Sequence, residues 1–99
     1  MTDMELRRRR ALYRAQHRGT KEMDIVIGRY AEAKLGAMDA AGLSLFEEFL
    51  ALPDPLLQGW LLTGDGTAPP AFEELVAGMR AHHGLLGGEQ GTDGGQAGR

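Results

Sequence analysis

The sequence predicts an all-α protein: a small five-helix bundle followed by a disordered, glycine-rich tail. Apolar residues recur at spacings of three and four along five segments. Glycine, proline or aspartate marks the breaks between segments, and no alternating stretch is long enough for a convincing strand. A chain of 99 residues allows one domain. We place the helical domain at residues 1–84 and the tail at residues 85–99, where glycine is dense and apolar residues are few.

The first helix is predicted from about Asp3, a suitable N-cap, to about His17. It carries the run Arg7 to Arg10. Because consecutive helical positions point about 100° apart, four adjacent arginines surround the helix and do not form one recognition face. They fit either a solvated face, with their alkyl stems on neighbouring surface, or a basic contact for a partner. The thin apolar stripe of this helix consists of Met4, Ala11, Leu12 and Ala15.

A corner between the first two helices is predicted at Gly19. Glycine adopts positive φ without a Cβ clash, so it can end one helix and release the next in a new direction. With Gly19 as the N-cap, Glu22 is the third helical residue, where a carboxylate can reach free backbone amides. Arg18 precedes the glycine, so a cation and an anion flank nearly bare backbone. This patch suits close approach by another macromolecule; a capping glycine followed by a capping acid is the simpler structural explanation.

The second helix is predicted from about Thr20 to Ala37. Apolar residues on a further side, Ile25 and Leu35, indicate a central helix packed by several neighbours. Gly28 interrupts the helix at a cost of about 1 kcal/mol relative to alanine, which favours a close helix crossing at that point. The residues that recur at spacings of three and four are Met23, Val26, Ile27, Tyr30, Ala31 and Lys34.

The third helix is predicted from its N-cap Asp39 to about Ala51. Its adjacent acids Glu47 and Glu48 point apart, so they are expected to face water and cannot form a catalytic carboxylate pair. The inner face of this helix consists of Leu43, Phe46, Phe49 and Leu50.

The fourth helix is predicted to begin after Pro53, with Asp54 as its N-cap, and to stop at Gly64. The fifth follows the loop through Pro69–Pro70 and ends near His82–His83. Favourable placement near a helix C-terminus accounts for these histidines better than metal binding does. The inner faces of the two helices consist of Leu57, Trp60 and Leu61, and of Phe72, Leu75, Val76 and Met79.

Charge and composition limit the classes of function. Residues 1–18 hold six arginines and two acids, whereas the rest holds five basic and twelve acidic residues, and the net charge is −3. Nucleic-acid-binding domains normally have a basic balance, which this chain lacks. A small nucleic-acid-associated regulatory protein using Arg7 to Arg10 is therefore kept as the alternative hypothesis. A metal or hydrolytic enzyme would need His17, His82 and His83 to converge, without cysteine or a second ligand cluster. We therefore expect a protein that is not an enzyme.

The sequence also predicts a cytoplasmic protein without membrane insertion. Its longest apolar runs are far shorter than the ~20 residues that span a bilayer. The first residues lack the apolar core of a secretory signal, and Asp3 and Glu5 argue against a transit peptide. The absence of cysteine fits a reducing compartment.

The segment Arg18-Gly19-Thr20-Lys21-Glu22-Met23-Asp24 resembles the Arg-Gly-x-x-Glu signature of the succinate dehydrogenase assembly factor family, the SdhE-type FAD assembly factors. The resemblance extends over roughly residues 6 to 83, in the right order and at the right separations. Two positions depart from the family pattern, since Leu56 stands where the family often has an acid and Gln58 where it often has an aromatic residue. The other matching segments are Tyr13-Arg14, Ile25 to Tyr30, and Phe46 to Pro55 running into Trp60.

This resemblance implies a five-helix bundle that binds the flavoprotein subunit of succinate dehydrogenase or of fumarate reductase. The family promotes covalent attachment of FAD to a histidine of that client, so FAD is expected on the client, with no cofactor or metal held tightly by this chain. The resemblance maps Arg18, Gly19 and Glu22 onto the motif that engages the client. We expect a monomer that does not bind nucleic acid. The same client-binding surface is predicted to include the flanking residues His17, Asp24 and Arg14.

Overall fold

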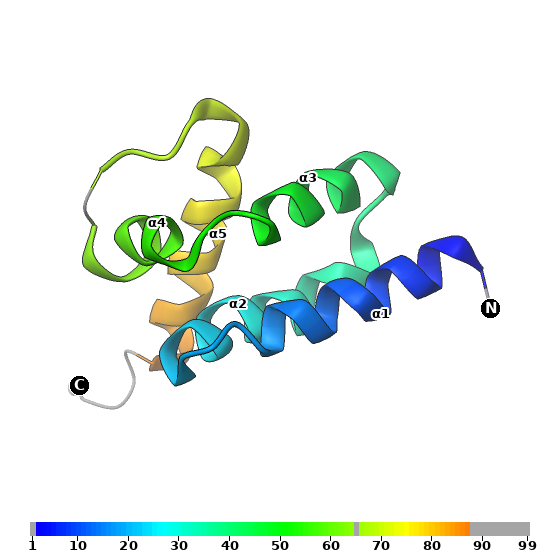
Figure 1. Ribbon diagram of the computed structural model, residues 1–99, viewed down its shortest axis with the longest axis horizontal. Coiled ribbons are helices and arrows are strands. Elements are labelled where there is room, and N and C mark those ends of the chain that lie inside the picture. The colour runs from blue at the N-terminus through cyan, green and yellow to red at the C-terminus, as the bar shows by residue number, and fades with distance from the viewer. Residues whose placement is uncertain (1, 65, 88–99) are drawn as a thin grey trace.

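The computed structural model describes residues 2–64 and 66–87, and the predicted tail from residue 88 onward lies outside them. Within these ranges the elements are all helical, so the all-α prediction and the order of five α-helices are confirmed (Figure 1). The elements are α1 (Asp3–Gln16), α2 (Lys21–Lys34), the 3₁₀ helix η1 (Leu35–Ala37), α3 (Ala40–Leu50), α4 (Asp54–Gln58), the π-helix η2 (Gly59–Thr63) and α5 (Pro70–Gly87).

Helices α1 and α2 form an antiparallel pair onto which the other helices pack. In Figure 1 they run side by side in opposite directions, with α3 above them and α5 passing α2 at a steep angle. Gly28 lies buried where α1 crosses α2: an added Cβ would be 3.0 Å from Gln16 Cγ and 3.3 Å from Gln16 Cα. The missing side chain therefore permits the close crossing that the sequence predicts.

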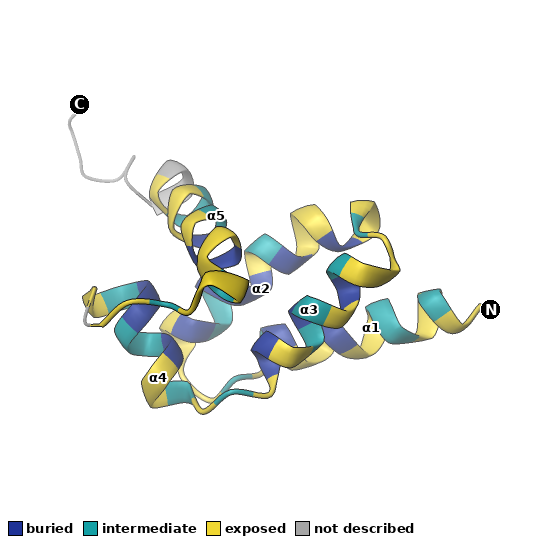
Figure 2. Ribbon diagram, turned by 90° about the horizontal axis from the view of Figure 1, so that it is seen from above, coloured by how far each residue is buried: buried dark blue, intermediate teal, exposed yellow. Residues whose placement is uncertain are grey.

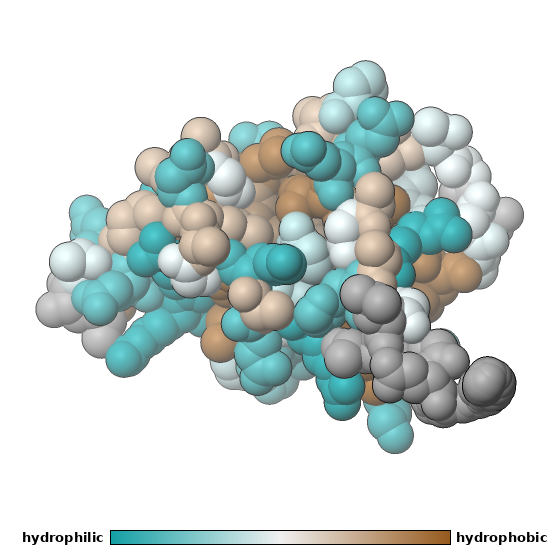
Figure 3. Space-filling view, turned by 180° about the vertical axis from the view of Figure 1, so that it is seen from behind, coloured by the Kyte–Doolittle hydropathy of each residue, from teal (hydrophilic) through white to brown (hydrophobic). Residues whose placement is uncertain are grey.

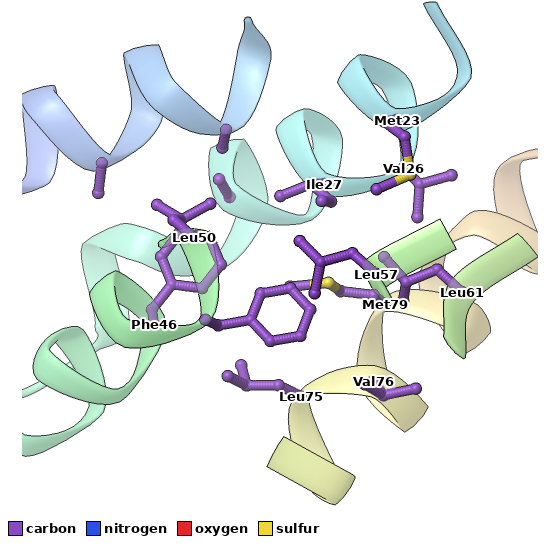
Figure 4. Packing of buried hydrophobic residues seen from close by; sticks show 14 of the residues in the cluster. Met23, Val26, Ile27, Phe46, Leu50, Leu57, Leu61, Leu75, Val76 and Met79 are labelled. Atoms are coloured by element: carbon purple, nitrogen blue, oxygen red, sulfur yellow. The ribbon is translucent and has the colours of Figure 1, made fainter. Parts of the chain in front are cut away.

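The hydrophobic core lies between α2, α3, α4, η2 and α5. Side chains from these elements converge on one space in Figure 4, and in Figure 2 the buried residues lie on the sides that the helices turn toward one another. The inner faces predicted for the last three helices are all buried or packed against buried residues. Small residues of α1, Ala11 and Ala15, close this core, whereas Lys34, which the spacing placed in the α2 stripe, is exposed.

The N-caps of α1 and α3 show how local hydrogen bonds set the helix starts. Thr2, not Asp3, caps α1. Its Oγ1 accepts from the Glu5 N–H at 3.1 Å, and the Glu5 carboxylate accepts from the Thr2 N–H at 2.9 Å. This reciprocal pair satisfies two backbone donors, which Asp3 alone cannot do. Asp39 caps α3 as predicted, accepting from the Gly42 N–H at 2.8 Å.

Three helix ends differ from the sequence-based predictions. α2 passes at Leu35 into the 3₁₀ helix η1, and α4 passes at Gly59 into the π-helix η2. α5 continues to Gly87, beyond the predicted boundary at residue 84, so His82 and His83 lie within the helix and not at its end. One glycine costs a helix only about 1 kcal/mol, so a glycine following the two histidines is not sufficient to stop α5.

Candidate functional site

The corner between α1 and α2 is an exposed backbone turn, and we call residues 17–22 the elbow. His17 is the C-cap of α1, and Gly19 follows with φ +125°, a conformation that other residues rarely adopt. Thr20, not Gly19, is the N-cap of α2, because its hydroxyl accepts from the Met23 N–H at 3.3 Å and glycine has no such acceptor. Gly19 is exposed, and a Cβ there would lie 3.7 Å from Asp54 Oδ2.

Arg18 reaches from the elbow to the junction of α3 and α4, in a set of contacts that we call the Arg18 clamp. Its Nε and Nη2 donate to Asp54 Oδ1 at 3.0 and 2.7 Å. Its Nη1 donates to the Leu50 carbonyl oxygen, and its Nη2 also donates to that of Leu52 at 3.0 Å. Leu50 is the last residue of α3, so the guanidinium satisfies carbonyl groups that have no donor within the helix. The clamp fixes the elbow to the start of α4.

The clamp leaves little of the Arg18 side chain exposed to solvent. Only 11% of its side chain is exposed, and its backbone N–H donates to Asp24 Oδ1. The sequence-based assignment of Asp54 as the N-cap of α4 is wrong: the N-cap is Pro53, and the Asp54 carboxylate accepts from the guanidinium instead. No local pattern indicates this pairing, because the two side chains are 36 residues apart in the sequence.

Glu22 lies on the open side of the elbow. It is exposed and sits in the first turn of α2, where a carboxylate is favoured by the positive end of the helix dipole. With Thr20 as the N-cap, Glu22 is the second helical residue and not the third, and its carboxylate makes no hydrogen bond or ion pair within residues 2–64 and 66–87. Gly19 and Lys21 are exposed beside it. The elbow therefore presents bare backbone next to an unpaired carboxylate.

Tyr13 and His17 continue this exposed surface along α1. Their rings stack with centroids 4.0 Å apart and planes 22° apart, and His17 Nδ1 lies 2.7 Å from the Tyr13 carbonyl oxygen. Arg14 is also exposed. His17, Gly19 and Glu22 are thus all exposed at the elbow, and Arg14 is exposed on the adjoining helix. Tyr13 is absent from the site predicted by sequence reasoning, and the available signal was a large aromatic residue outside the apolar stripe of α1.

The first arginine of the run, Arg7, is paired inside the molecule. Its Nη2 and Nε donate to the two carboxylate oxygens of Glu47 at 2.8 and 3.2 Å, and Nη2 also donates to Ser44 Oγ at 3.0 Å. This hydrogen bonding lowers the pKa of Glu47, and the charges of Arg14 and Arg10 lower it further. The prediction that Glu47 simply faces water is therefore wrong.

The other three arginines of the run divide between internal contacts and solvent. Arg8 donates from Nε to the Leu35 carbonyl oxygen at 3.1 Å and from Nη2 to that of Met38 at 2.9 Å. Arg9 and Arg10 are exposed and make no hydrogen bond or ion pair with any residue that the structure describes. Only half of the run is therefore free to meet a partner.

Elsewhere on the described surface, the histidines and acids do not form a metal site. His82 packs edge-on against Tyr30, with ring centroids 6.2 Å apart. Among the described residues, no three His, Cys, Asp or Glu side chains are grouped as a metal ion requires. None of the described helices combines the length and apolar character needed to cross a membrane. On the face in Figure 3, hydrophobic residues appear in small areas separated by hydrophilic ones.

The fold and the elbow define a class of protein, a small helical module whose rigidly held, exposed corner suits contact with a larger macromolecule. The particular family follows from sequence comparison. The family model described as the flavinator of succinate dehydrogenase matches residues 9–83, and the chain belongs to this family.

Individual relatives agree with this assignment. The FAD assembly factor SdhE of Acetobacter pasteurianus is 38% identical over 86 residues, which cover 83% of this chain and 79% of that protein. The SdhE of Coxiella burnetii is 40% identical over 59 residues, covering 60% and 72%. The mitochondrial succinate dehydrogenase assembly factor 2 of Dictyostelium discoideum is 28% identical over 83 residues, covering 84% and 58%. No solved structure gives a significant match. The family resemblance noted in the sequence is confirmed.

Proposed function

We propose that this protein is an assembly factor that binds the flavoprotein subunit of succinate dehydrogenase or fumarate reductase and promotes covalent attachment of FAD to it. The observation that carries the proposal is the exposed elbow of a flavinator-family chain, where bare backbone at Gly19 lies beside the unpaired carboxylate of Glu22. Backbone without a side chain allows a partner to approach closely, and a carboxylate without an internal partner is available to a donor on the client.

In this proposal the factor supplies no catalytic group. The client contributes both FAD and the histidine to which FAD becomes attached, and the factor holds the client in the conformation that brings them together. Orientation of reacting groups can lower a barrier by several kcal/mol, and preferential binding of one conformation is sufficient to populate it. The factor is then a chaperone-like protein and not an enzyme, and it holds no cofactor tightly because FAD belongs to the client.

Arg18 has a different part in the proposal from Gly19 and Glu22. Its guanidinium is committed to Asp54 and to two backbone carbonyl oxygens, so we assign it a positioning role. It holds the elbow in the shape that the client meets, while Gly19 and Glu22 make the contact. A rigid elbow binds at a lower entropic cost than a mobile one.

The principal test replaces Gly19. Gly19→Arg adds a long side chain where the client backbone or surface is expected to lie, so covalent flavin on the client should be lost while the helical content is largely retained. The measurement is in-gel flavin fluorescence of the client from cells that carry only the variant, together with pull-down of the client and circular dichroism. Gly19→Ala is the matched control, because it imposes the same positive-φ strain with little added bulk. Normal flavin on the client with Gly19→Arg would contradict the proposed site.

A second test separates the contact made by Glu22 from its contribution to the helix. Glu22→Ala should reduce flavinylation, and the loss of a favourable charge near the α2 N-terminus should cost only about 0.3–1 kcal/mol of stability. Glu73→Ala is the matched control, because it removes an exposed acid from the first turn of another helix, α5, outside the elbow. Equal activity of the two variants at equal melting temperature would remove Glu22 from the site.

The alternative function is nucleic-acid binding through the arginine run. Arg7 and Arg8 are engaged within the molecule, which leaves Arg9 and Arg10 as the described members of the run without a hydrogen bond or ion pair. This alternative predicts duplex binding that weakens steeply with added salt.

The cytoplasmic location and monomeric state expected from the sequence also belong to the assembly-factor proposal. Cell fractionation tests the location, and mass measurement by light scattering tests the oligomeric state.

A further inference from the structure

One face of α1 points away from the whole bundle and continues into the elbow. The buried residues of this helix, Ala11 and Ala15, define its inner side. Successive residues are rotated by about 100°, so positions close to the opposite direction recur at spacings of three and four. The members of this α1 outer face are Leu6, Arg9, Arg10, Tyr13 and, at the elbow, His17.

This outer face exposes large apolar and charged side chains. Tyr13 is 64% exposed and Leu6 40% exposed, and both are among the large hydrophobic residues that the described structure leaves open. Arg9 and Arg10 are exposed between them on the helix surface, with no hydrogen bond or ion pair to any described residue. Glu5, whose pKa is lowered mainly by its hydrogen bonds to Thr2, is already engaged in the capping box.

The composition and rigidity of this face are those of a protein-binding surface. Tyrosine and arginine are enriched where interfaces draw their binding energy, and an exposed leucine adds apolar area. Tyr13 is held by its stack on His17, so little side-chain freedom remains to be lost when a partner covers it. A nucleic acid would bind the two arginines, but its binding does not generally require an exposed leucine.

The elbow alone is also too small for a specific interface. A stable interface usually covers about 800 Å² on each partner and about 20–30 residues a side, whereas the elbow has six residues. The docking surface must therefore extend onto neighbouring structure. One direction is α1, about 20 Å long, whose outer face shares His17 with the elbow. The other is α4, whose start touches the elbow through Asp54 and where Leu56 is exposed.

We infer that the α1 outer face is the second part of the docking surface and binds an acidic, partly apolar strip on the same flavoprotein client. This inference rests on the proposed function. Arg9 and Arg10 meet carboxylates of the client. Leu6 and Tyr13, which flank the two arginines along the helix, pack against apolar parts of the same strip. The α4 direction offers a leucine but no exposed cation, so it lacks the charge that would select an acidic strip.

The test measures client binding by variants of the outer face. The double variant Arg9→Glu/Arg10→Glu should bind the client roughly ten-fold or more weakly, with a smaller salt dependence than the parent chain, because two charges turn from attractive to repulsive. Arg29→Glu/Arg80→Glu is the matched control, since it reverses two exposed arginines on α2 and α5 and should bind normally.

The apolar part of the face is tested separately. Tyr13→Ala should also weaken client binding roughly ten-fold, whereas Leu56→Ala on α4 should leave it unchanged. Because these side chains are exposed, circular dichroism and thermal melting should show that the variants fold normally. Leu6→Ala, farther from the elbow, gives a third measurement of client binding along the same face.

The outcomes distinguish this inference from the function on which it rests. If the parent chain does not bind or flavinylate the client, both fail. If Gly19→Arg abolishes binding but Arg9→Glu/Arg10→Glu behaves like its control, the elbow stands and the α1 outer face is overturned. Loss of binding with Leu56→Ala alone would place the second contact on α4. If Arg9→Glu/Arg10→Glu binds the client normally but loses duplex DNA binding, the face belongs to a nucleic-acid contact. If it instead loses self-association, the face belongs to a contact with a second copy of the chain.

Discussion

Two arginines join α1 and the elbow to the rest of the bundle, and the two joints differ. Within α1, Arg8 donates to the carbonyl oxygens of Leu35 and Met38, where α2 has ended. Just beyond the end of α1, Arg18 likewise donates to two carbonyl oxygens where α3 has ended, but it also forms an ion pair with Asp54. In both places a cation donates to backbone carbonyl groups at a helix end, although the Leu35 oxygen also accepts from the Met38 N–H.

The difference is that the Arg18 joint combines a strong internal attachment with exposed backbone. Beside Arg8, Gly36 has ordinary φ and open space around it, so that joint does not depend on glycine. Beside Arg18, Gly19 has φ +125° and is open to solvent. An arginine in a binding signature can therefore serve the scaffold, while the glycine and the acid near it remain exposed to solvent.

The largest expected effect comes from Arg18→Ala. The substitution leaves the carbonyl groups of Leu50 and Leu52 without donors. It also leaves the Asp54 carboxylate, which is 29% exposed, without its cation. The free energy of unfolding should therefore fall by about 3 kcal/mol. Chemical denaturation measures this loss. A double-mutant cycle with Asp54→Ala isolates the ion pair, and strictly additive losses would mean that the two side chains do not interact as described.

The glycines at the two joints should respond differently to alanine. Gly19→Ala places a Cβ at a strongly positive φ and should cost about 1–3 kcal/mol. Gly36→Ala meets no atom within 4 Å and has no positive φ, so its cost should be close to zero. Parallel thermal melts compare them, and equal melting temperatures would show that the elbow is not strained by a side chain.

A smaller loss is expected from Arg8→Ala. Two carbonyl groups lose a charged donor, but no carboxylate is left behind, so we expect about 1–2 kcal/mol. Denaturation midpoints for this variant and for Arg18→Ala, measured together, test the contrast between the joints. If Arg8→Ala were the more destabilising, the ion pair with Asp54 would not be the source of the difference.

The smallest effect concerns Arg7 and Glu47, which also connect α1 to α3. Hydrogen bonding to Arg7 lowers the pKa of Glu47 from 4.5, so this pair adds stability above about pH 4.5 and loses it as the pH falls through the lowered pKa. Both side chains are about one-third exposed, so the contribution is small. Glu47→Gln should weaken the protein slightly at neutral pH and flatten its acid-induced loss. An unchanged acid profile would contradict the pairing.

The helices and their inner faces are predictable from the sequence because their signals are local. Apolar residues at spacings of three and four place Phe46 and Met79 in the core without knowledge of the fold. The elbow is also partly local, since a glycine between two helical segments favours positive φ, and Gly19 has it. The N-cap predicted from the sequence, Gly19, is one residue too early, because a glycine at a break and the Thr20 hydroxyl after it give competing signals.

The Arg18 clamp is not predictable in the same way. An arginine at the end of a helix is equally suited to solvent, a partner or a distant carboxylate, and only the packed arrangement of α3 and α4 selects among them. The same applies to Arg7 and Arg8, whose partners on other helices and loops lie 27 to 40 residues away. Residue spacing within one helix contains no information on contacts at that separation.

The clamp also determines when the elbow acquires its final shape. The partners of the Arg18 guanidinium all lie at residues 50 to 54, so a nascent chain that has made only its first two helices has only local contacts at that corner, such as the Arg18 N–H bond to Asp24 Oδ1. The guanidinium contacts can form only after the α3–α4 junction has been synthesised and has docked. A copy in which that junction is unfolded therefore lacks the Arg18 clamp.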